Sequence, residues 1–125
     1  MATEYILRKA ERWDLPALEV MLDRGIKESN GLLPPYDPEH AWHAAIQQIQ
    51  QGLIILAVQK EEKREKIVGG LALDLHGWAW NPRIRYRRSV HYYVLAEHRK
   101  DKTTDGKLLG DALLHAGKEL SFAIS

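Results

Sequence analysis

The sequence contains no cysteine among its 125 residues. Disulfide bonds, thiolate metal ligands and a cysteine nucleophile are therefore excluded. Long apolar runs are missing as well, so no stretch predicts a membrane-spanning helix. The first residues, MATEYILRKAE, carry acidic groups and lack the apolar core of a signal peptide. From these absences we expect a soluble cytoplasmic protein without a membrane partner.

An excess of either charge is also missing. The chain has 18 Lys and Arg residues against 17 Asp and Glu residues, which gives a net charge of +1. Such a balance produces no general attraction to nucleic acid or to an anionic membrane. Hydrophobic residues make up 45% of the chain and charged residues 28%, as in ordinary globular proteins. A chain of this length can form one hydrophobic core, and we predict a single domain over residues 1–125.

What the sequence does contain is a succession of elements in the order β-α-α-β-β-β-α. Apolar runs and alternation indicate strands, whereas apolar residues three and four apart indicate helices. Asp14 is expected to cap the first helix, and the second helix is expected to start at Asp37 or Pro38. The Gly69-Gly70 pair predicts a bulge or a close approach of the backbone in a strand. Before the last strand and helix, the predicted elements are a strand at 5–8, helices at 15–27 and 37–51, and strands at 53–59 and 66–74.

The stretch from Ser89 to Leu120 is the most informative part of the chain. Val90–Ala96 is rich in β-branched and aromatic residues, which predicts a buried strand. From Asp105 to Leu120, apolar residues recur at spacings of one, three and four, which places them on one face of a helix. We expect Thr104 or Asp105 to cap the start of this helix.

The loop between this strand and this helix has the features of an anion site. Gly106 allows the backbone to stay open and close to a ligand. The first N–H groups of a helix point outward at the positive end of the helix dipole, where they can bind an anion. We therefore expect this loop to hold a phosphate or a pyrophosphate.

Two motifs follow each other in this stretch: Val94-Leu95-Ala96-Glu97-His98-Arg99 and, after the six residues KDKTTD, Gly106-Lys107-Leu108-Leu109-Gly110-Asp111-Ala112-Leu113-Leu114. Together they resemble the coenzyme A signature of the GCN5-related N-acetyltransferases. In that signature a strand ending in V-x-P-E-x-R leads through R/Q-x-x-G-x-G/A into a helix with A-L-L. Gly110 matches the second glycine, whereas Leu108 stands at the first glycine and Asp105 at the Arg/Gln position.

The resemblance implies an α/β (α+β) fold with a mixed, mainly antiparallel sheet, of the acyl-CoA N-acyltransferase type. It also implies that the protein transfers an acetyl group from acetyl-CoA to a small-molecule or protein amine. The strand backbone near Tyr93–Ala96 would pair with the pantetheine arm, and the amides of about Gly106–Gly110 would hold the pyrophosphate. The residues expected to bind acetyl-CoA are Tyr93, Val94, Ala96, Arg99, Gly106, Lys107, Leu108, Leu109 and Gly110.

Family members continue past the signature helix with a further strand, a helix and a hairpin. Residues 120–125 are expected to begin such a strand, so the resemblance predicts a domain that is incomplete at its C-terminus. Arg99, Lys102 and Lys107 are expected to balance the charge of the cofactor phosphates.

Acetyl transfer also needs a base that takes a proton from the amine. Side chains alternate along a strand, so Ser89, His91 and Tyr93 are expected on one face. A histidine titrates near neutral pH, and His91 is therefore the predicted base. Glu97 and His98 at the strand end are alternatives. A structural histidine, hydrogen-bonded within the sheet, is the competing interpretation of His91.

Other functions stay open on the residues alone. Arg83–Arg88, which follows Trp78 and Trp80, alternates arginine with apolar residues and could contact nucleic acid. We rank this alternative lower, because the same arginines can keep an edge hairpin soluble. A catalytically inactive binding or structural module with the same fold is a further alternative. A second copy of the chain, in a homodimer, is a further partner considered. His40 and His43 share a helix face without a third ligand, so we expect no metal site.

Overall fold

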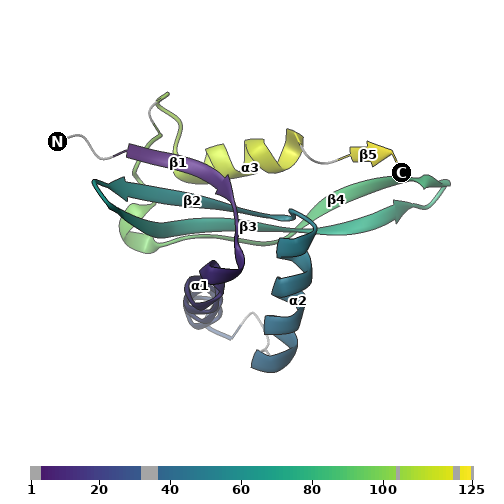
Figure 1. The fold of residues 1–125 in the computed structure, drawn as a ribbon, viewed down its shortest axis with the longest axis horizontal. Coiled ribbons are helices and arrows are strands. Elements are labelled where there is room, and N and C mark those ends of the chain that lie inside the picture. The colour runs from purple at the N-terminus through teal and green to yellow at the C-terminus, as the bar shows by residue number, and fades with distance from the viewer. Residues whose placement is uncertain (1–3, 32–36, 104, 120–121, 125) are drawn as a thin grey trace.

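The computed structural model describes residues 4–31, 37–103, 105–119 and 122–124. Its elements follow the predicted order, and the strand expected near the C-terminus completes them (Figure 1). The strands are β1 Glu4–Lys9, β2 Ile54–Glu61, β3 Arg64–Trp78, β4 Asn81–Val94 and β5 Phe122–Ile124. The helices are α1 Leu15–Glu28, α2 Pro38–Gln50 and α3 Leu109–Glu119, and the short 3-10 turns are η1 Arg12–Asp14 and η2 Ala96–His98. Within these residues, no helix combines the length and the apolar character needed to cross a membrane.

The five strands form one sheet in the order β1-β2-β3-β4-β5, and every observed pairing is antiparallel. The register between β2 and β3 shifts, because Ala57 lies opposite Gly69 whereas Val58 lies opposite Ile67. Val68 is the extra residue, and the bulge predicted from the adjacent glycine pair is confirmed.

Helices cover both faces of the sheet: α3 lies on one face, and α1 and α2 lie on the other (Figure 1). Leu109 and Leu113 of α3 are fully buried in a cluster with Leu71 of β3. On the opposite face, Met21 of α1 belongs to a second buried cluster. The described part of α2 has no buried residue, and its Trp42 is 37% exposed. The alanines and isoleucines of α2 are half-buried.

The aspartates at the starts of the first two helices have different roles. Asp37 caps α2, since its carboxylate accepts a hydrogen bond from the Glu39 amide at 3.0 Å. Asp14 makes no side-chain cap to α1; it accepts hydrogen bonds from Arg8 at 2.8 Å and from the Glu11 amide at 2.7 Å. Burial alone would raise the pKa of Asp14, but these two hydrogen bonds lower it below its ordinary value.

The last predicted strand and helix have different bounds in the structure. The strand ends at Val94, and Ala96 belongs to η2 instead. The helix begins at Leu109, four residues after the predicted start at Asp105, because Lys102 and Leu108 form an isolated antiparallel bridge.

The prediction that Asp105 caps α3 is therefore wrong. Its carboxylate accepts a hydrogen bond from the Thr103 hydroxyl within the loop. Thr104, the other predicted cap, lies outside the described residues. The turn that joins β3 to β4 lies at residues 79–80.

Candidate functional site

One edge of β4 is open beside the start of α3. β5 pairs with β4 only at residues 84–86, and no other described strand pairs with that side of β4 as far as Val94. The Leu95 amide donates to the Val68 carbonyl of β3 at 2.8 Å. Peptide groups alternate in an antiparallel ladder, so those of Val94 and Tyr92 face away from β3. The open edge therefore offers hydrogen-bonding backbone to an extended ligand.

A groove of about 320 Å³ runs along this edge. Its lining residues are Tyr92, Tyr93, Val94, Arg99, Leu108, Gly110 and Asp111. The Tyr92 side chain reaches across to α3, where a Cβ atom at position 110 would collide with its hydroxyl. Glycine at this position thus permits the close approach of strand and helix. The groove brings together five of the residues predicted to bind acetyl-CoA, from both sequence motifs.

The loop before α3 provides acceptors for several of its own amides. Gly106, with a φ of +86°, donates to the Thr103 carbonyl at 2.9 Å. The Lys107 amide donates to the Thr103 hydroxyl at 3.3 Å. The Leu109 amide donates to the Asp101 carbonyl at 3.2 Å. Three of the amides expected to hold a pyrophosphate therefore already have acceptors within the chain.

Two other amides in the first turn of α3 lie beside the groove. Gly110 and Asp111 both line it, and they precede Ala112, whose amide donates to the Leu108 carbonyl at 2.9 Å. Amides at this place in a helix lack an intrahelical acceptor and can bind an anion. The Asp111 carboxylate brings an opposing charge, and burial together with that charge raises the pKa of Tyr92.

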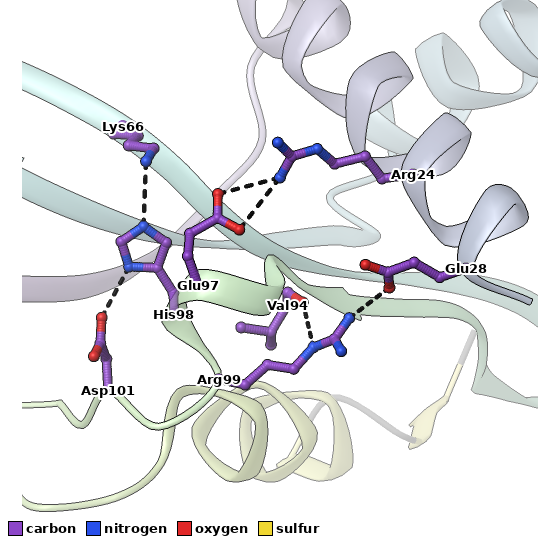
Figure 2. Close-up of polar contacts among 8 residues, drawn as sticks. All are labelled: Arg24, Glu28, Lys66, Val94, Glu97, His98, Arg99 and Asp101. Carbon is purple, nitrogen blue, oxygen red and sulfur yellow. Dashed lines mark hydrogen bonds and ion pairs between the residues drawn. The ribbon is translucent and has the colours of Figure 1, made fainter.

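Asp101 holds the loop and the start of α3 in place. Its carboxylate accepts a hydrogen bond from the Tyr5 hydroxyl at 2.5 Å and lies 2.8 Å from Nδ1 of His98. The other ring nitrogen of His98 lies 3.2 Å from Nζ of Lys66 (Figure 2). The contacts with Tyr5 and His98 lower the pKa of Asp101, and burial together with Asp101 raises the pKa of Tyr5 to about 12. His98, one alternative base, is thus engaged through both ring nitrogens.

Two ion pairs connect α1 to the segment after β4 (Figure 2). Arg24 lies 3.2 Å from the Glu97 carboxylate, and Arg99 lies 2.7 Å from the Glu28 carboxylate. A hydrogen bond from its own amide and the contact with Arg24 lower the pKa of Glu97, which makes Glu97 a weaker base. Sequence reasoning missed Glu28 as a site residue, because nothing in the α1 sequence distinguishes it from an ordinary exposed charge.

Arg99 makes two further contacts at the open edge. Its Nε donates to the Val94 carbonyl at 2.9 Å, and its guanidinium lies 5.4 Å from the centre of the Tyr93 ring. Tyr93 is 7% exposed, and its hydroxyl has no hydrogen-bond partner among the described residues. Burial and the nearby Glu28 carboxylate raise the pKa of Tyr93.

The remaining predicted residues are distributed more widely. His91 pairs with Ala72 of β3, but its side chain lies outside the described part of the structure, as do those of Arg87 and Arg88. Exposed positions are occupied by Ala96, Lys107, His40, His43, Arg83 and Arg85. Arg83 and Arg85 lie near the N-terminal end of β4, at the end opposite the groove.

Comparisons with known proteins give a result at the level of structure only. A scan against protein-family models and a sequence search of curated proteins each found no match. Among solved structures, a predicted acetyltransferase from Clostridium acetobutylicum with acetyl-CoA is similar over 92% of this chain and 74% of its own, with a TM-score of 0.62 and 18% identity.

Two aminoglycoside acetyltransferases from uncultured soil metagenomic samples are also similar. The first, in complex with sisomicin, is matched over 92% of this chain and 68% of its own, with a TM-score of 0.58 and 16% identity. The second is matched over 96% of this chain and 72% of its own, with a TM-score of 0.54 and 18% identity. At these identities the likeness concerns the fold, which agrees with the observed element order and sheet. The chain therefore has the acyl-CoA N-acyltransferase fold of the GCN5-related N-acetyltransferases.

Proposed function

We propose that the protein transfers an acetyl group from acetyl-CoA to the amine of a small molecule. The observation that carries this proposal is the open edge of β4 next to the first turn of α3. The pantetheine arm contains amide groups, which can pair with the outward peptide groups of Tyr92 and Val94 as an added strand would. A structurally similar acetyltransferase was crystallised with acetyl-CoA, which supports the same donor.

The phosphates of the donor would lie at the start of α3. The amides of Gly110 and Asp111 would bind them, and Arg99 and Lys107 would supply positive charge. Because the Gly106 amide has an acceptor in the loop, we assign it a smaller part in phosphate binding than the resemblance implies.

The transfer itself needs few side chains. An outward backbone N–H, such as that of Tyr92, would polarise the thioester carbonyl. The neutral amine attacks the carbonyl carbon, a C–N bond replaces the C–S bond, and the departing thiolate takes up a proton. His91 is the proposed base, since its side chain is expected on the same strand face as Tyr93. Glu97 is the weaker alternative because of its contact with Arg24.

The acceptor we favour is a small-molecule amine, since two similar structures are aminoglycoside acetyltransferases. A protein amine is the other acceptor considered. The cytoplasmic location stays a prediction from the sequence.

Release of CoA tests the proposed function. The protein has no cysteine, so a thiol reagent in the assay reports only on released CoA. We expect thiol release from acetyl-CoA in the presence of small amines, aminoglycosides included. His91→Ala should lower the rate about 100-fold while leaving the affinity for acetyl-CoA unchanged. Binding of acetyl-CoA without release with any amine would instead support a catalytically inactive binding module.

A further inference from the structure

Arg99 binds a backbone carbonyl on the open edge of β4 that an extended donor molecule would also bind. The Val94 carbonyl is one of the outward-facing groups of β4, and Nε of Arg99 donates to it at 2.9 Å. An amide of the donor that pairs with Val94 must replace this hydrogen bond. We propose that Arg99 is a latch, which closes the open edge of β4 in the unliganded protein and opens when the donor binds. This inference rests on the proposed function.

The latch is held closed by contacts on the α1 side of the sheet. Arg99 lies 2.7 Å from the Glu28 carboxylate, and its guanidinium packs on the Tyr93 ring at 5.4 Å. The side chains of Arg99 and Glu28 are 49% and 43% exposed. Ion pairs with this much exposure to water are weak and break at small cost. The structure therefore describes a latch that a ligand can open by a change of side-chain rotamer.

Opening the latch has consequences on both sides of the sheet. The released guanidinium becomes available to the phosphates of the donor. On the α1 side, the Glu28 carboxylate loses its cation next to the buried Tyr93 hydroxyl, which has no partner among the described residues. A carboxylate and a phenol in this arrangement suit a cationic amine.

The chain contains a natural control for this inference. The Arg24–Glu97 pair joins the same helix to the same segment, at 3.2 Å. Among the residues drawn in Figure 2, the Val94 carbonyl is bonded to Arg99 and not to this pair. A second control is Asp23, which pairs with Lys27 on α1 at 2.9 Å. Asp23→Asn removes the same charge from the same helix as Glu28→Gln does.

Calorimetric titration with acetyl-CoA tests the latch. The apparent dissociation constant equals the intrinsic constant divided by the fraction of open protein. Loss of a half-exposed ion pair should therefore tighten binding of acetyl-CoA to Glu28→Gln about two- to fivefold. Arg24→Gln and Asp23→Asn should bind acetyl-CoA as the wild type does.

The outcomes separate this inference from the proposed function. Equal or weaker binding to Glu28→Gln overturns the latch, as does an equal gain in Asp23→Asn, which would assign the effect to net charge. If acetyl-CoA binds to the wild type and to Glu28→Gln alike, the proposed donor site stands and the latch alone fails. If acetyl-CoA binds to neither protein, both fail.

A second measurement follows the latch directly in the wild-type protein. The Nε–H of Arg99 should give a distinct signal in a ¹H–¹⁵N NMR spectrum, assigned by its absence in Arg99→Lys. We expect saturating acetyl-CoA to move this signal away from its hydrogen-bonded position. An Nε–H signal that stays in place when acetyl-CoA is bound contradicts the latch.

Discussion

The two faces of the sheet are covered in different ways. On one face, α3 places Leu109, Ala112 and Leu113 in the core, two of them fully buried. On the other face, α2 has no buried residue among those described, and exposed ion pairs connect α1 to the segment after β4. The proposed donor site therefore lies on a firmly packed element. The surface proposed to bind the acceptor amine is formed by α1 and the segment after β4, whose exposed ion pairs can break at small cost.

The largest effect should come from the packed face. Leu113→Ala removes a fully buried side chain of α3 and should lower the free energy of unfolding by about 3 kcal/mol. Ile49→Ala in α2, where the side chain is half-buried, should cost about 1 kcal/mol. Urea denaturation of both variants measures the difference. Equal losses would remove the contrast between the two faces.

A buried ion pair is the exception on the α1 face. Asp14→Asn weakens the contact with Arg8 at 2.8 Å and should lower the free energy of unfolding by about 2 kcal/mol at pH 7. The pKa of Asp14 is lower in the folded state than its ordinary value. Its stabilising contribution is thus complete above the unfolded pKa and is lost as the pH falls through the folded pKa.

Denaturation of the wild type and Asp14→Asn at several pH values checks this sign. The difference between the two proteins should shrink below about pH 4. If the difference in unfolding free energy between the two proteins stays constant down to pH 2, the charge of the Asp14 carboxylate does not stabilise the contact between β1 and η1.

The groove should be sensitive to one methyl group. Gly110→Ala places a Cβ atom against the Tyr92 hydroxyl, which forces that side chain to move within the groove. We expect affinity for acetyl-CoA to fall about tenfold, or about 1.4 kcal/mol. Gly77→Ala is the matched control, since no atom lies within 4 Å of its added Cβ. An unchanged affinity in Gly110→Ala would separate the groove from donor binding.

The smallest effect should come from the far end of the β3–β4 ribbon. Trp80 is 84% exposed, and Trp80→Ala should change the free energy of unfolding by less than about 0.5 kcal/mol. Affinity for acetyl-CoA should be unchanged as well. A clear loss of affinity for acetyl-CoA would extend the donor site beyond the groove.

The sequence predicts the features of the fold that depend on local patterns. Element order, the start of α2 at Asp37-Pro38 and the bulge beside Gly69-Gly70 each follow from residues that are close in the chain. The start of α3 could not be predicted in this way. It is fixed by Asp101, which contacts Tyr5 across 96 positions of sequence.

The same distinction between local patterns and distant contacts applies to the candidate site. Gly110 and Val94 were found because they stand in sequence motifs. Glu28 was missed because its role comes from Arg99, which lies 71 positions away in the sequence. Asp14 was assigned to the wrong partner for a related reason, since Arg8 of β1 is a charged donor that the cap pattern does not include.

The open edge of β4 as a donor site can be tested by an NMR titration with acetyl-CoA. If the edge and the start of α3 bind the donor, the backbone amide signals of Tyr92, Val94, Gly110 and Asp111 will shift together and saturate, while those of Arg83 and Arg85 will not move. Amide signals that stay unchanged at millimolar acetyl-CoA, or that shift only at the arginine end of β4, would contradict this assignment.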